Sequence, residues 1–140
     1  MKKCLAIAML TVVLVCAFSA CMQTKGDPIE TIKKLNEKNY SVEVIVNDEE
    51  IADLADDVEI KSEGIYLIVV AVPNDSENGK MGLAFYCNSN DIAKELEEDL
   101  RAYLNKEKNN NIMETFVRGT VECEGSVVFM GCEDVWQVMQ

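Results

Sequence analysis

The feature that most constrains the fold is an uninterrupted apolar run at residues 65–72, Ile-Tyr-Leu-Ile-Val-Val-Ala-Val. Its length and its β-branched content predict a strand, and Pro73 ends it. A strand with one face in water would alternate apolar and polar residues, but this run and residues 127–130 are apolar on both faces. Either helices cover the sheet on each side, or an apolar sheet face meets a partner. We expect internal coverage, for example by the first and last helices opposite the central pair.

Periodicity and capping patterns predict nine elements along the chain. In order these are a helix from Asp27, a strand at 40–46, a helix from Asn47 that ends between Asp56 and Gly64, strands at 65–72 and 81–87, a helix capped within 88–91 and ended by 109–111, strands at 115–123 and 126–131, and a helix at 133–140. The order α-β-α-β-β-α-β-β-α predicts an α+β fold, a two- or three-layer sandwich of helices and a mixed or antiparallel sheet of four or five strands. Its centre matches the split βαβ pattern of a ferredoxin-like core.

The first helix and the strand after it carry more detailed expectations. Asp27 should be the N-cap, Pro28 the first helical residue, and Asn39 a left-handed stop. The inward face of this helix should consist of Ile29, Ile32 and Leu35 or Asn36. The following strand should be half-buried, because it alternates around Val42, Val44 and Val46.

Charge and composition exclude several classes of function. Acidic residues outnumber basic ones by 25 to 13, and the chain contains no histidine. The formal charge of −12 argues against nucleic acid as a partner, because a polyanion is bound by a basic face. Without histidine there is no Ser-His-Asp or Cys-His catalysis and no imidazole ligand for a metal.

The segment at 1–20 has the organisation of a secretory signal. Lys2 and Lys3 form a short positive region, residues 4–18 are uncharged and apolar, and the small residues Ser19 and Ala20 follow. Removing this segment would take two lysines away and leave a mature chain with a formal charge of −14. Anionic headgroups would repel such a chain except where an anchor holds it.

The signal ends in the tetrapeptide Phe18-Ser19-Ala20-Cys21. It resembles the lipobox of bacterial lipoproteins, which is an aliphatic residue, two small residues and a cysteine, although Phe18 replaces the usual leucine. The resemblance implies that Cys21 is thioether-linked to diacylglycerol, and that cleavage between Ala20 and Cys21 makes Cys21 the mature N-terminus. It divides the chain into a signal peptide at 1–20, a lipidated tether at 21–26 and a single α+β domain at 27–140. Two or three acyl chains would then hold the domain at the extracytoplasmic face of the cell membrane.

Three other interpretations of this segment stay open. Cleavage after Ser19 without lipid would use Ala17 and Ser19 as the small pair. The 19 residues at 4–22 are apolar or small, and are just long enough to span a bilayer as an uncleaved anchor. Cys21 could also be an ordinary apolar residue at the end of that run. Cys16 does not fit a lipobox, because the bulky residues 13–15 precede it.

Three further cysteines, Cys87, Cys123 and Cys132, lie in the expected domain. The favoured interpretation is that they are small apolar residues of the core. A disulfide ranks second, and a reactive thiol ranks third. A last hairpin that turns at 124–126 would place Cys123 opposite Val127 and Cys132 opposite Arg118, about 15 Å apart and too far to bridge. Cys132 would begin a helix and is therefore the best candidate for a thiolate.

Carboxylates are common, but they follow no catalytic or calcium-binding pattern. Glu49, Glu50, Asp53, Asp56 and Asp57 crowd one segment, Asp75 and Glu77 lie in a loop, and Glu95, Glu97, Glu98 and Asp99 occupy outer faces of a helix. A solvated surface accounts for them. Val135 and Trp136 should seal one edge of the core. The sequence thus assigns no catalytic residue, no metal ligand and no cofactor.

Two longer patterns stand out in the expected domain. One is the strand Val127-Val128-Phe129-Met130-Gly131 before the last helix, and the other is the strand-to-helix step from Phe85 to an Ala-Lys pair at Lys94. In these features the chain resembles a group of small, uncharacterised lipoproteins of Gram-positive bacteria. That resemblance implies no activity.

The sequence therefore predicts a lipoprotein that acts by binding or scaffolding, with the lipid bilayer as a partner through Cys21 and an unidentified protein as a second partner. One alternative is a thiol-based enzyme or redox protein that uses Cys132 or Cys87. Another is a small-ligand carrier for a transporter, with a pocket between Tyr66, Phe85, Phe129 and Trp136.

Overall fold

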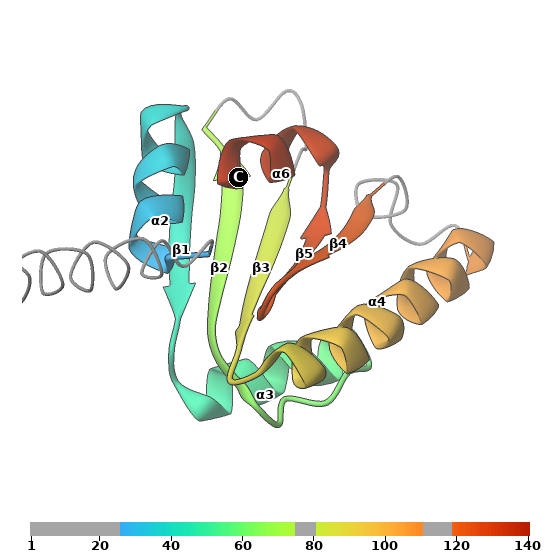
Figure 1. The fold of residues 1–140 in the computed structure, drawn as a ribbon. Helices are drawn as coiled ribbons and strands as arrows, with labels where there is room; N and C mark the ends of the chain where they lie inside the picture. Colours follow the sequence, from blue (N-terminus) through green and yellow to red (C-terminus); the bar gives the residue numbers. More distant parts are fainter. Residues whose placement is uncertain (1–25, 75–80, 111–118) are drawn as a thin grey trace, which may run out of the picture.

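The chain folds around one five-stranded sheet in a computed structural model, which describes residues 26–74, 81–110 and 119–140 (Figure 1). The elements are α2 (Pro28–Glu37), β1 (Tyr40–Ile45), α3 (Asp48–Asp57), β2 (Ile65–Pro73), β3 (Gly82–Cys87), α4 (Asn90–Asn110), β4 (Thr120–Glu124), β5 (Val127–Gly131) and α6 (Glu133–Met139). The strand order is β1-β2-β3-β5-β4, and every neighbouring pair is antiparallel. The predicted α+β class and the predicted order of elements are confirmed.

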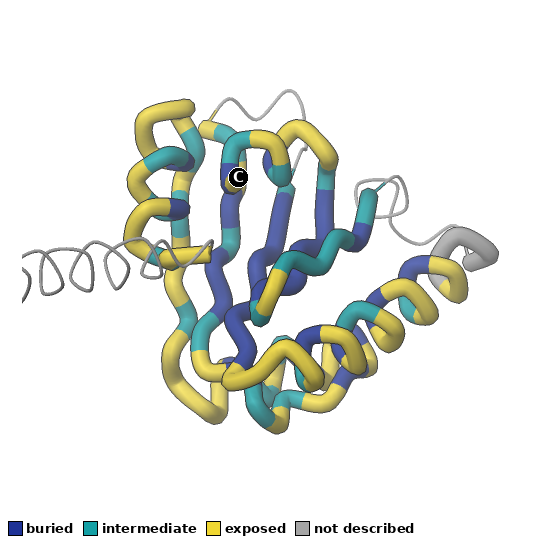
Figure 2. The backbone as a smooth tube through the Cα atoms, viewed as in Figure 1, coloured by how far each residue is buried: buried dark blue, intermediate teal, exposed yellow. Residues whose placement is uncertain are grey.

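Helices cover both faces of the sheet, as the apolar runs predicted. On one face, α3 and α4 bury Ile68, Phe85 and Val128. On the other face, α2 and α6 bury Val69, Phe129 and further residues of the same strands. Figure 2 shows the resulting pattern, in which the central strands are buried and the outer faces of the helices are exposed. The coverage is incomplete at the two ends of β2, where Tyr66 and Val72 are exposed.

The ferredoxin-like expectation is refined by the strand order. In one half of the sheet, α4 connects β3 to β4, and β5 lies between these two strands, which is a split βαβ unit. In the other half, β1 and β2 are direct neighbours, whereas a ferredoxin-like core would place β3 between them. The lengths of the connecting helices explain this difference between the two halves of the sheet. The 10-residue α3 is about 15 Å long and lies below the end of the sheet, whereas the 21-residue α4 is about 31 Å long and carries the chain along it (Figure 1).

Local signals set the bounds of α2 as expected. Asp27 is the N-cap and accepts a hydrogen bond from the backbone N–H of Ile29, and Pro28 is the first helical residue. Asn39 follows the helix with φ of 65°, the left-handed conformation predicted for a stop.

The inward face of α2 differs from the prediction at Ile29. Leu35 is fully buried and Ile32 packs against the same cluster, but Ile29 is 76% exposed. Thr31 is buried instead, and its side chain hydrogen-bonds to the phenol of Tyr86 under the helix. Because Thr31 and Leu35 are four residues apart, they share one stripe, and Ile29 falls outside it.

The expectation of a half-buried β1 is also corrected. Val42 is partly buried, but Val44 is 41% exposed and Val46, one residue beyond the strand, is 62% exposed. β1 is an edge strand whose end runs past α2, so the residues near that end remain open (Figure 1).

The predicted signal peptide, the lipidation position Cys21 and the tether before Gly26 lie outside the described residues. In the ranges that are described, no helix is long and apolar enough to cross a membrane.

Candidate functional site

The three cysteines of the domain are divided between the two faces of the sheet. Cys87 on β3 and Cys123 on β4 lie on the face covered by α3 and α4. Cys132 is the N-cap of α6 and packs with the cluster on the opposite face. All three are free thiols. The sheet therefore separates Cys132 from the other two.

The register of the last hairpin differs from the expected one by one residue. The turn has two residues, Gly125 and Ser126, and Cys123 lies opposite Val128 rather than Val127. Gly125 has φ of 62°, a conformation typical of short hairpin turns and one that glycine adopts without a steric penalty. Thr120 lies opposite Gly131, which is the residue before Cys132. Along β4, Thr120 is three residues from Cys123. These two thiols are too far apart to bridge, as predicted.

Cys87 and Cys123 share a face but are also too far apart for a disulfide. Cys123 lies opposite Val128 on β5, and Val128 lies opposite Phe85 on β3, two residues before Cys87. Two strand spacings amount to about 10 Å, whereas the Cα atoms of a disulfide lie within about 7 Å. The disulfide interpretation is therefore not met in this fold.

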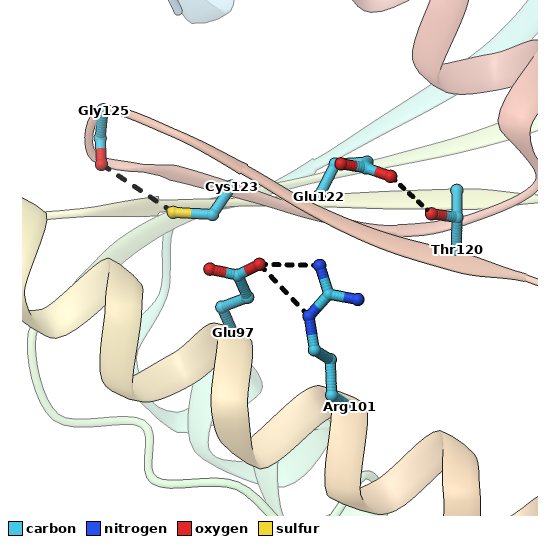
Figure 3. A network of polar contacts seen from close by, with 6 residues as sticks. All are labelled: Glu97, Arg101, Thr120, Glu122, Cys123 and Gly125. Carbon is cyan, nitrogen blue, oxygen red and sulfur yellow. Dashed lines mark hydrogen bonds and ion pairs between the residues drawn. The ribbon is translucent and has the colours of Figure 1, made fainter.

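Burial makes both of these thiols poor nucleophiles. Burial raises the pKa of Cys87 from 9.0 to about 11, with a smaller contribution from Cys123. Burial is also the main cause that raises the pKa of Cys123, which lies above the Glu97–Arg101 ion pair of α4 (Figure 3). The thiol of Cys123 donates a hydrogen bond to the carbonyl oxygen of Gly125, with the sulfur 4.0 Å from the oxygen. At neutral pH both groups are protonated, and a protonated thiol is unreactive.

Cys132 is half-buried at the start of α6, where the sequence predicted it. Its side chain makes no capping hydrogen bond, and α6 has only seven residues. Glu133 and Asp134 occupy the first turn, so two carboxylates already meet the partial positive charge of this helix end. No histidine exists in the chain to act as a base.

Carboxylates form a solvated surface on α3 and α4, as predicted. Glu95, Glu98 and Asp99 are exposed, and the half-buried Glu97 accepts two hydrogen bonds from Arg101, at 2.7 and 3.1 Å. In the part of the chain that the structure describes, no group of three or more Asp, Glu, Cys or His side chains could hold a metal ion. The expected loop residues Asp75 and Glu77 lie outside that part.

The four aromatic residues considered for a ligand pocket are not brought together. Phe85 is buried on the α3 and α4 face, and Phe129 is buried on the other. Phe129 stacks on Trp136 with ring centroids 5.3 Å apart, and Val135 is fully buried beside them. Val135 and Trp136 therefore seal the core, as the sequence predicted. Tyr66 is half-exposed and contacts Tyr86 at a centroid distance of 6.4 Å.

Two shallow hollows flank the segment that leads into β2. One, of about 360 Å³, is lined by Asp48, Ile51, Ser62, Glu63, Gly64, Ile65, Tyr66 and Asn88. The other, of about 210 Å³, is lined by Lys61, Glu63, Ile65, Ile92, Glu95, Leu96 and Asp99. Both are open to solvent, and neither is lined by one of the three cysteines.

A surface that the sequence analysis missed lies beside the point where the described chain begins. It consists of four exposed apolar side chains, Ile29, Val44, Val46 and Tyr66, which we call the exposed apolar patch. Val44 and Val46 point to the face that α2 and α6 cover, because Val44 lies opposite the buried Val69 of that cluster and side chains two residues apart share a face. Tyr66 reaches the same face through its contact with Tyr86. The position of β1 at the sheet edge, which the sequence does not specify, exposes Val44 and Val46.

Comparison of the chain with protein families, with curated proteins and with solved structures finds no match.

Proposed function

We propose that this protein is a lipoprotein, anchored through acyl chains on Cys21 to the extracytoplasmic face of a bacterial cell membrane, and that it acts by binding or scaffolding rather than by catalysis. The observation that carries the proposal is the tetrapeptide Phe18-Ser19-Ala20-Cys21 at the end of a positively charged and then apolar segment. The first described helix begins shortly afterwards, with Asp27 as the N-cap of α2. This spacing suits a short tether between an anchor and a domain.

Metabolic labelling with an alkyne fatty acid tests the anchor. The full chain should take up the label in a bacterium that processes lipoproteins, and Cys21→Ala should abolish it. Cys16→Ala is the matched control, because it removes a cysteine from the same apolar run without changing the tetrapeptide. Label that persists in Cys21→Ala would overturn the lipobox.

The chemistry of the domain supports binding over catalysis. The thiols of Cys87 and Cys123 are kept protonated by burial, and Cys132 lies on the other side of the sheet from them. A pair of thiols that exchanges electrons must come within bonding distance, and these do not. The carrier alternative also lacks support, because the aromatic residues that would line its pocket lie on opposite faces of the sheet.

Crosslinked pull-down from membranes tests the binding role. The anchored full chain should recover a partner protein that Cys21→Ala does not recover, since only the anchored form is concentrated at the membrane. Failure to recover any protein specific to the anchored form would count against scaffolding. Fast alkylation of Cys132 by iodoacetamide at neutral pH would instead favour the thiol enzyme.

A further inference from the structure

We propose that the exposed apolar patch lies against the outer leaflet of the membrane, so that the domain sits on the bilayer in one orientation, with α3 and α4 directed away from it. This inference rests on the proposed function, because it requires the anchor on Cys21. The occupant of the patch is the lipid surface itself. Three independent observations support this: the length of the tether, the position of the apolar side chains and the distribution of charge.

The tether is too short to let the domain leave the membrane surface. Gly26 is five residues after Cys21, and five residues span at most about 18 Å even when fully extended. Gly26 is seated against the sheet, because a Cβ atom built on it would lie 2.6 Å from the side chain of Val127. Whatever path residues 22–25 take, the domain surface around Gly26 must stay within that distance of the anchored cysteine.

Apolar side chains gather on this side of the domain. The described residues include five large apolar side chains that are exposed, and the exposed apolar patch contains four of them. Ile29 belongs to the first turn of α2, three residues after Gly26, while Val44 and Val46 are on the sheet face that α2 covers only in part. Apolar groups exposed to water gain free energy when they enter the boundary between headgroups and acyl chains.

The acidic residues are concentrated on the opposite side. α3 carries six acidic residues and no basic one, and α4 carries six acidic and four basic ones. On the side of the patch, α2 carries two acidic and two basic residues, and the shorter α6 carries two acidic residues and no basic one. An anionic leaflet repels acidic surfaces within a Debye length, so the side formed by α3 and α4 is the one that turns away. Lys33 and Lys34 of α2 can approach the same leaflet without that penalty.

A photoreactive amino acid tests the orientation in the full, anchored chain. p-Benzoyl-phenylalanine is placed at Val46 in one variant and at Ile29 in a second, so that the test does not depend on one substitution folding correctly. Glu98 on the outer face of α4 is the matched control, since it is also exposed but lies on the opposite side. After irradiation of isolated membranes, mass spectrometry measures phospholipid adducts on each variant.

We expect several-fold more phospholipid adduct at positions 46 and 29 than at position 98. Equal adduct at all three positions, or adducts of a protein in place of phospholipid at position 46, would overturn the orientation. The intact mass of the same samples separates this failure from failure of the proposed function. A mature chain that carries the lipid but shows no preference at position 46 refutes the orientation alone, whereas a chain without lipid refutes both proposals.

Discussion

The two helix layers that cover the sheet differ in charge and in completeness. The α3/α4 layer buries Leu96, Leu100 and Leu104 along the length of α4 and presents an acidic outer surface. The α2/α6 layer consists of two short helices and leaves Val44, Val46 and Tyr66 exposed. Both layers bury fully enclosed side chains, so both contribute to stability. The proposed orientation would account for this difference, because it places the α2/α6 side against the membrane and leaves the α3/α4 side in water.

Matched truncations of one buried phenylalanine on each face give the largest expected effects. Phe85→Ala and Phe129→Ala should each lower the free energy of unfolding by about 3–5 kcal/mol, because each removes a fully buried ring. Phe129→Ala also loses the stack with Trp136, which is worth about 0.5–1.5 kcal/mol. Urea unfolding measures both values.

Tryptophan fluorescence assigns each effect to its layer. Phe129→Ala should shift the emission of Trp136 in the folded state, and Phe85→Ala should leave it unchanged, because Phe85 lies on the other side of the sheet. If Phe129→Ala cost much less than Phe85→Ala, the α2/α6 layer would not be a core in its own right.

An alkaline titration of stability should detect the buried thiol of Cys87 in the α3/α4 layer. The folded state holds the proton of Cys87 up to a pKa of about 11, whereas an unfolded chain releases it near 9.0. The unfolded state therefore binds fewer protons in this window, and stability falls as the pH rises from about 9 to about 11. Cys87→Ala should flatten this part of the curve of unfolding free energy against pH.

Cys132→Ala removes the thiol on the opposite face of the sheet and is the control for replacing a cysteine as such. Burial also raises the pKa of Tyr86. Because Tyr86 is present in both variants, its contribution to the slope of unfolding free energy against pH is the same in each. An unchanged slope in Cys87→Ala would show that its thiol is accessible to water in the folded state.

The smallest effects are expected from ion pairs on the outer faces of the two layers. Arg101→Ala should cost less than about 1 kcal/mol, although the Arg101–Glu97 pair is well formed at 2.7 Å, because Arg101 is exposed. Lys33→Ala on α2 should cost even less, since Lys33 and Glu37 are 4.0 Å apart and both are exposed. A loss of several kcal/mol in either variant of the urea series would show that these pairs have a structural role.

Features that depend on residues close in sequence were predicted correctly. The N-cap at Asp27, the stop at Asn39 and the strand before Pro73 follow from hydrogen bonds and steric limits within a few residues. The apolar runs also predicted cover on both faces, because such strands are unstable against water on either side. The lipidation of Cys21 is of the same local kind, and it stays a prediction.

Features that depend on residues far apart in sequence were predicted less well. The one-residue error in the register of Cys123 came from the length of the turn, and it changed which residue lies opposite the thiol. The direct pairing of β1 with β2 could not be inferred, because the same element order is compatible with several strand orders. The exposure of Val44 and Val46 follows from that pairing, since it leaves β1 at an edge that α2 covers only in part.

By itself the sequence determined the elements, their order, the need for two helix layers and the acidic surface, because periodicity, capping and charge are properties of neighbouring residues. Only the tertiary structure decided which strands are neighbours, which face each helix covers and how far apart the three thiols lie. It also decided that the exposed apolar side chains gather beside Gly26, since this depends on strand pairing and helix packing between segments far apart in the chain.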